Sequence, residues 1–167
     1  MKLIQESVFI SEILFQSNQV LYAMDRINEC ADNSDHMGIW SSIQSFLIST
    51  SNISKIFWPK KKYENRGNHL RNLLQIPDNC DLKSRKFRNK LEHYDDFISE
   101  YFEDLTSYHY VDLVMNPSLS STSLSLCHRG YNTFNNTLIL KGEILDLNKI
   151  LEKVILIRNK CLKIQSF

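Results

Sequence analysis

The N-terminal half of the chain repeats its apolar residues with the period of an α-helix, and this pattern most restricts the fold. Two such stretches cover residues 4–31 and 36–58. Asn33-Ser34-Asp35 interrupts the pattern and offers a side-chain cap for a second helix, and Pro59 ends that helix. The apolar positions are Ile4, Val8, Ile10, Leu14, Leu21, Met24 and Ile27 in the first stretch and Ile39, Ile43, Phe46, Leu47, Ile53 and Phe57 in the second. We therefore predict two long amphipathic helices.

Three further helices are expected after Pro59. A short one covers residues 68–74, a longer one runs from Leu82 to Asp104, and the last covers Glu143 to Ile164, where apolar residues again recur at helical spacing. In the helix from Leu82, the apolar residues lie on one stripe that we expect to be core: Phe87, Leu91, Tyr94, Ile98 and Tyr101.

The segment 107–141 has a different character. It contains a polar, serine-rich loop, a turn-rich stretch at 132–136 and a β-like run at 137–140, with a weaker apolar run at 124–128. We expect a small antiparallel β-hairpin here and no strands elsewhere. The fold class is therefore mainly α, an up-and-down helical bundle with this hairpin before the last helix, and residues 1–167 are expected to form one domain.

Composition sets the class of protein. With 43% hydrophobic and 23% charged residues in 167 positions, the chain is expected to be globular. No apolar run approaches the roughly 18 residues of a membrane span, and no export leader is recognisable, so we expect a cytoplasmic protein without membrane contact. Its four cysteines are scattered and form no CxxC pair, and its histidines show no metal-ligand spacing, so reduced thiols and no metal or other cofactor are expected.

Charge is concentrated in one stretch. Residues 55–93 carry a net charge of +7, although the whole chain carries only +1. A local positive field attracts polyanions even when the protein as a whole is near neutral. The candidate nucleic-acid-binding residues are Lys60, Lys61, Lys62, Arg85, Lys86 and Lys90. The alternative is that Lys60–Lys62 is an ordinary solvated loop.

One group of residues could carry chemistry. On a helix, Asn89 and His93 share a face, and Arg88 lies about 140° around the axis from His93. Histidine can take the proton of a ribose 2′-hydroxyl near neutral pH, and arginine can stabilise charge that develops on the phosphate. Asparagine can orient the ring. Because RNA carries its own nucleophile, such a site needs no metal. The alternative is that Arg88 has no catalytic role and forms a surface ion pair with Glu92.

The sequence Arg88-Asn89-x-x-x-His93 resembles the Arg-to-His motif of the HEPN superfamily. The flanks Phe57-Trp58-Pro59, Arg66-Gly67, Leu70-Arg71 and Leu82-x-x-Arg85, with the stretch from Asn136 to Leu147, are similar to uncharacterised bacterial members. The resemblance implies a helical bundle, usually dimeric, in which two Arg/His helices form a composite ribonuclease site. Arg88 and His93 would be the catalytic pair, with Asn89 beside them. Some family toxins carry a modifiable Tyr two residues after the His, but here that position is Asp95.

Three functions remain open at this stage. The first is a metal-independent endoribonuclease acting on RNA as a homodimer, as a toxin or defence effector with a cognate antitoxin or partner protein. The second is a catalytically inactive HEPN-like module that binds a protein or nucleic acid. The third is a helical scaffold in which Arg88 and His93 are structural. Residues 94–112 hold six acidic residues and no Lys or Arg, which favours a solvated or partner-facing patch there.

Overall fold

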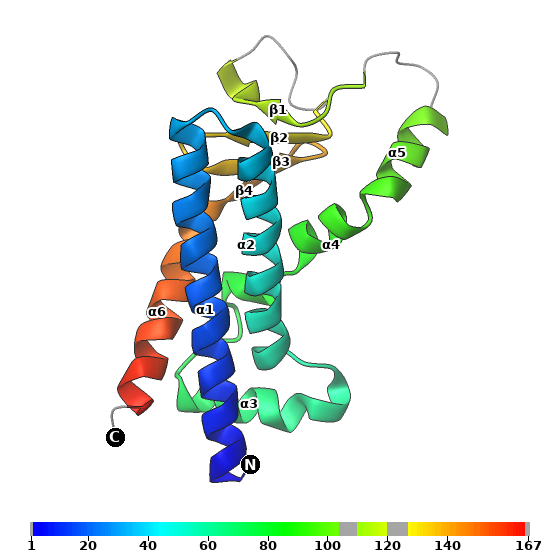
Figure 1. Cartoon of the computed structure of the whole chain (residues 1–167). Coiled ribbons are helices and arrows are strands. Elements are labelled where there is room, and N and C mark those ends of the chain that lie inside the picture. The colour runs from blue at the N-terminus through cyan, green and yellow to red at the C-terminus, as the bar shows by residue number, and fades with distance from the viewer. Residues whose placement is uncertain (1, 104–109, 120–126, 166–167) are drawn as a thin grey trace. The chain divides into compact units, whose positions relative to one another are not determined.

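A computed structural model describes residues 2–103, 110–119 and 127–165. These residues are mainly helical, with one small four-stranded sheet (Figure 1). They divide into two compact units. The helical unit contains the described residues of 1–85 and 149–167, and the sheet unit contains those of 86–148. The assignment of residues 1–167 to one domain stays a prediction.

Two long antiparallel helices form the main part of the helical unit, as the sequence predicts (Figure 1). They are α1, Leu3–Asp32, and α2, His36–Phe57. Asp35 caps α2 by accepting a hydrogen bond from the backbone N–H of Gly38 at 2.9 Å. Their facing side chains form the core, and the residues most completely buried include Ile13, Val20, Ile27, Ile43, Phe46 and Ile53.

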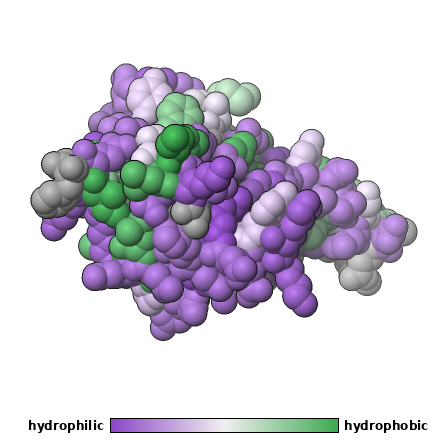
Figure 2. All heavy atoms as spheres, turned by 90° about the horizontal axis from the view of Figure 1, so that it is seen from below, coloured by the Kyte–Doolittle hydropathy of each residue, from purple (hydrophilic) through white to green (hydrophobic). Residues whose placement is uncertain are grey.

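The first turns of α1 depart from the expected apolar face. Ile4 and Val8 are exposed, with exposed fractions of 81% and 61%, because the buried face of this helix begins only at Ile10. Figure 2, which looks onto the end where α1 begins, shows apolar side chains gathered on part of that surface.

Shorter elements complete the helical unit. A 3-10 turn, Lys61–Tyr63, leads into α3, Glu64–Leu73, which begins four residues earlier than expected. A second 3-10 turn covers Asp81–Lys83. The last helix, α6, spans Leu147–Gln165 and belongs to this unit from Lys149 on. Its side chains reach α1, since Arg158 Nε donates to Asn18 Oδ1 at 2.7 Å and Gln165 Nε2 donates to Ser11 Oγ at 3.1 Å.

The helix expected over 82–104 is wrong as one continuous element. Its residues form the 3-10 turn at Asp81–Lys83, then α4, Lys86–Glu92, a turn at His93, and α5, Tyr94–Glu103. No residue of α4 or α5 is buried, so the expected core stripe is wrong as well. A helix draws most of its stability from packing one face against a core, and without that packing nothing requires the helix to continue through His93.

The β-hairpin is confirmed, and it extends into a larger sheet. The sheet order is β1-β2-β3-β4, with β1 parallel to β2 and the other pairs antiparallel. The expected run at 137–140 is β3, Thr137–Leu140, paired with β2, Arg129–Asn132. β1 covers Val114–Met115, followed by a 3-10 turn at Pro117–Leu119. Of the weaker run at 124–128, residues 124–126 lie outside the described residues, and Cys127 forms an isolated bridge with Val111.

The fourth strand corrects two predictions. Glu143–Asp146 forms β4, so the last helix begins at Leu147 and strands are not confined to 107–141. Lys141 and Gly142 make the turn between β3 and β4, with φ angles of 50° and 73°. Positive φ at both central residues is typical of the tight turns that join antiparallel strands, and glycine favours it. Asp146 Oδ1 then accepts from the backbone N–H of Asn148 at 3.0 Å, at the start of α6.

No helix among the described residues combines the length and the apolar character needed to cross a membrane. All four cysteines are free: Cys30, Cys127 and Cys161 are buried, and Cys80 is partly exposed.

Candidate functional site

The predicted catalytic arginine lies in the middle of α4. Arg88 Nη1 forms an ion pair with Glu92 Oε2 at 2.7 Å and donates to Asn89 Oδ1 at 2.8 Å. The ion pair expected from the sequence is therefore present, and the amide of Asn89 shares the same guanidinium. Only 23% of the Arg88 side chain is exposed, whereas Asn89 is exposed.

The predicted catalytic histidine lies at the turn between α4 and α5. The backbone N–H of His93 donates to the Asn89 carbonyl at 3.0 Å and so closes the last turn of α4. The imidazole is 67% exposed, and its Nδ1 lies 3.8 Å from Oδ2 of Asp96. This separation is longer than a hydrogen bond, so Asp96 is a nearby carboxylate that does not fix the tautomer of the ring. Within the described residues, no hydrogen bond or ion pair joins Arg88 to His93.

The two basic residues beside the motif share one carboxylate. Lys86 Nζ lies 2.6 Å from Glu143 Oε2, and Lys90 Nζ lies 2.9 Å from Glu143 Oε1. The hydrogen bonds from Lys86 and Lys90 hold the pKa of Glu143 below its usual value. Glu143 therefore offsets part of the positive charge that the sequence places around the motif. Sequence reasoning missed this contact because it placed Glu143 in the last helix.

The other predicted nucleic-acid-binding residues belong to the helical unit. Lys60, Lys61 and Lys62 are exposed at the 3-10 turn before α3, and Arg85 is half-buried. The Lys62 ammonium lies 5.4 Å from the centroid of the Tyr63 ring. These four residues and the α4 lysines thus fall in different compact units.

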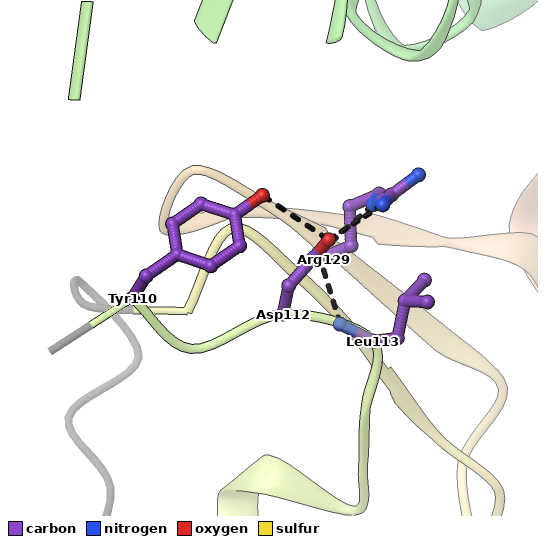
Figure 3. A network of polar contacts seen from close by, with 4 residues as sticks. All are labelled: Tyr110, Asp112, Leu113 and Arg129. Carbon is purple, nitrogen blue, oxygen red and sulfur yellow. Dashed lines mark hydrogen bonds and ion pairs between the residues drawn. The ribbon is translucent and has the colours of Figure 1, made fainter. Parts of the chain in front are cut away.

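A polar network that the sequence did not suggest lies in the sheet unit (Figure 3). Arg129 donates from Nε to Asp112 Oδ1 at 2.9 Å and from Nη2 to Asp112 Oδ2 at 2.5 Å. Asp112 also accepts from the Tyr110 hydroxyl at 3.2 Å and from the backbone N–H of Leu113 at 2.9 Å. Burial alone would raise the pKa of Asp112, but the hydrogen bonds and charge of Arg129 and the backbone hydrogen bond lower it overall.

A small hollow lies beside this network. It has a volume of about 20 Å³, enough for one water molecule, and is lined by Lys90, Tyr94, Phe97, Tyr110, His128, Arg129, Leu140 and Lys141. The His128 ring contacts the rings of Tyr110 and Tyr101, with centroids 4.6 and 4.8 Å away. Burial lowers the pKa of His128, so the neutral imidazole is favoured. We interpret this cluster as structural, because its cations already contact carboxylates or aromatic rings.

The residues that the structure describes contain no group of three or more His, Cys, Asp or Glu side chains placed to hold a metal ion.

Comparison with protein-family models, with curated proteins and with solved structures gave no match for this chain.

Proposed function

We propose that the chain is a metal-independent endoribonuclease of the HEPN type that works as a homodimer, with Arg88 and His93 as the catalytic pair. The observation that carries the proposal is the position of His93. Its imidazole is 67% exposed at the end of a helix, with a carboxylate 3.8 Å from Nδ1 and an arginine five residues earlier. A histidine so placed can present Nε2 to a substrate.

The reaction follows from these groups. His93 Nε2 takes the proton of a ribose 2′-hydroxyl, and the 2′ oxygen attacks the adjacent phosphorus. The bond from phosphorus to the 5′ oxygen breaks, and the 5′ oxygen takes up a proton from water. The products are a 2′,3′-cyclic phosphate end and a 5′-hydroxyl end. Arg88 stabilises the charge on the phosphate oxygens. It must first exchange Glu92 for phosphate, and such a helix-surface ion pair contributes only a few tenths of a kcal/mol.

The homodimer would bring an arginine and a histidine together, which one protomer does not do. Arg88 is oriented toward Glu92 and Asn89, and no hydrogen bond joins it to His93 within the described residues. Two α4 helices packed about a two-fold axis would place the Arg88 of one protomer near the His93 of its partner. RNA is the substrate of this proposal, and a cognate antitoxin or another partner protein would restrain a toxic nuclease.

The test is RNA cleavage by the purified chain in excess EDTA, with the ends identified by mass spectrometry. We expect cleavage that yields cyclic phosphate ends and falls at least 100-fold in His93→Ala and Arg88→Ala. His36→Ala is the matched control for an exposed histidine, and Arg26→Ala is the control for an exposed helix-surface ion pair, here with Glu29 at 2.7 Å. Intact RNA, or equal loss in the controls, would contradict the proposal.

A second function is favoured by a separate observation. Arg88, Lys86 and Lys90 all contact carboxylates of their own unit, as they would in a catalytically inactive module that binds a protein or nucleic acid. Retained partner binding in His93→Ala, together with harmless expression of the wild-type chain, would favour this function. Growth arrest on expression that His93→Ala relieves would favour the nuclease.

A further inference from the structure

An open groove lies in the helical unit, at the connection between α2 and α3. Its volume is about 710 Å³, large enough for a nucleotide. It is lined by Trp58, Pro59, Lys61, Glu64, Asn68, Arg71, Asp78 and Lys83. Several of these residues belong to the flanking sequences that resemble bacterial HEPN-like proteins, and the proposed nuclease chemistry uses none of them.

Arg71 fixes one wall of the groove. Its guanidinium donates to the Phe57 carbonyl at the end of α2 and to Asn68 Oδ1, and its Nε lies 2.9 Å from Asp78 Oδ1. The same guanidinium lies 5.6 Å from the centroid of the Trp58 ring. Only 13% of the Arg71 side chain is exposed. Arg71 therefore contacts Trp58, Asn68 and Asp78 and is not a free cation.

Several hydrogen-bond donors at the groove have no partner in the described part of the chain. Trp58 is 9% exposed, and its indole N–H is a buried donor without an acceptor. Lys61 and Lys83 are exposed, and neither ammonium forms an ion pair with a described residue. An unpaired buried donor destabilises the free protein, and a ligand would reach the Trp58 N–H once the indole ring turns toward the groove. The lysines of α4 differ, because both contact Glu143.

The groove also carries acceptors. Glu64 is exposed at the first turn of α3, and the Asp78 side chain is 78% exposed beside Arg71. These carboxylates would repel a bare phosphate but can accept hydrogen bonds from ribose hydroxyls or base N–H groups. The 2′-hydroxyl is the group that distinguishes RNA from DNA at such a site. The mixture of ammonium groups and carboxylates thus matches a ribonucleotide better than a simple anion.

We propose that this groove binds a nucleotide of single-stranded RNA, with its phosphate at Lys61 and Lys83 and its ribose or base toward Glu64 and Asp78. The choice of RNA as ligand rests on the proposed function. The site adds a substrate-binding surface, held by Arg71, that is separate from Arg88 and His93 in sequence.

Binding is tested by fluorescence anisotropy with a short, labelled, single-stranded RNA of mixed sequence. The His93→Ala protein is used throughout, so that cleavage does not interfere. We expect the double variant Lys61→Glu, Lys83→Glu to weaken binding about tenfold and to reduce the salt dependence, since two phosphate contacts account for a slope of roughly 1.4 on single strands. The matched control is Lys153→Glu, Lys163→Glu, which makes the same charge change at exposed positions of α6 in the same unit.

The second measurement reports on the groove itself. The chain has two tryptophans, so its proton–nitrogen spectrum holds two indole signals, which Trp40→Phe assigns. We expect the RNA to shift the Trp58 signal and leave that of Trp40, which is buried in α2. DNA of the same sequence should bind more weakly.

The outcomes separate this proposal from the nuclease. Binding that weakens only in the groove variant, together with a wild-type chain that leaves the RNA intact, would support the groove and contradict the nuclease. Cleavage by the wild-type chain, together with unchanged binding in the groove variant, would contradict the groove alone. Equal loss in both double variants, or an unmoved Trp58 signal, would show only nonspecific attraction of RNA to positive charge and would overturn the proposal.

Discussion

Arg129 holds Asp112 through two parallel hydrogen bonds, of 2.9 Å from Nε and 2.5 Å from Nη2 (Figure 3). Both side chains are largely buried, with exposed fractions of 19% and 14%. The pair joins the segment before β1 to the first residue of β2, in a part of the sheet that otherwise has only a two-residue parallel strand. A bidentate guanidinium–carboxylate pair fixes geometry as well as adding energy.

The first prediction concerns this pair. Arg129→Ala leaves the Asp112 carboxylate largely buried and without its cation, so we expect the free energy of unfolding to fall by about 1–3 kcal/mol. Urea unfolding monitored by circular dichroism measures the change. Arg26→Ala, which removes an exposed and solvent-screened pair, should lower the free energy of unfolding much less. Equal effects of the two substitutions would show that the buried pair contributes no more to the free energy of unfolding than an exposed pair does.

The second prediction concerns acid. Asp112 has a lowered pKa in the fold, so its stabilising contribution is present above its unfolded value, about 3.9, and is lost as the pH falls through the folded value. The pKa of His128 is lowered too, by burial, so its neutral form stabilises the fold above about pH 6.5 and that contribution is lost as the pH falls toward the lowered value. Between pH 7 and 5, melting temperature should therefore drop less in His128→Gln than in wild type.

The control for that comparison is His36→Gln, because His36 is exposed at the start of α2. It should keep the wild-type pH dependence. A nuclear magnetic resonance titration that finds His128 protonating at or above the usual histidine value would contradict the assignment.

The third prediction concerns Gly67 of α3, which packs against the end of α2. A Cβ on Gly67 would lie 2.5 Å from the Phe57 carbonyl oxygen and 2.5 Å from Pro59 Cδ. Neither atom belongs to a flexible side-chain end, so the backbone must shift. We expect Gly67→Ala to lower stability by about 1–3 kcal/mol, the usual cost of overpacking. Asn65→Ala, at an exposed position of the same helix, should be neutral or slightly stabilising in thermal unfolding.

The fourth prediction concerns the shared carboxylate of the sheet unit. Glu143→Gln removes the negative charge that Lys86 and Lys90 contact, so the positive charge around α4 is offset less and attracts phosphate more strongly. We expect RNA affinity of the His93→Ala protein to rise several-fold and its salt dependence to steepen. Glu152→Gln makes the same charge change at an exposed position of α6 and should have a smaller effect. Equal gains from both would trace the change to net charge alone.

The fifth prediction concerns the dimer. If two His93 side chains face a shared cleft, cysteines placed there should cross-link under mild oxidation. We expect His93→Cys in a Cys80→Ser background to give a covalent dimer on non-reducing gels, because the other three cysteines are buried. His36→Cys in the same background should stay monomeric on those gels. A chain that sediments as a monomer and does not cross-link at position 93 would remove the composite site.

Local sequence determined the long helices and the turn-bounded strands. The helical period of α1 and α2, the cap at Asp35 and the stop at Pro59 act between neighbours along the chain, so they could be predicted without knowing the fold. The β-like run at 137–140 likewise gave a strand. The Arg88–Glu92 ion pair, one turn apart on a helix, belongs to the same class of local interaction.

Only the tertiary structure decided the partners that are distant in sequence. It divided the residues expected in one helix into α4, which ends at Glu92, and α5. It also made β4 from residues expected in a helix, because β3 offered a hydrogen-bonding edge. It also paired Lys86 and Lys90 with Glu143, and Arg129 with Asp112. The attraction between two charged side chains depends on the distance between them in the fold. The path of the whole chain sets that distance, so the residues adjacent to each side chain in sequence do not reveal its partner.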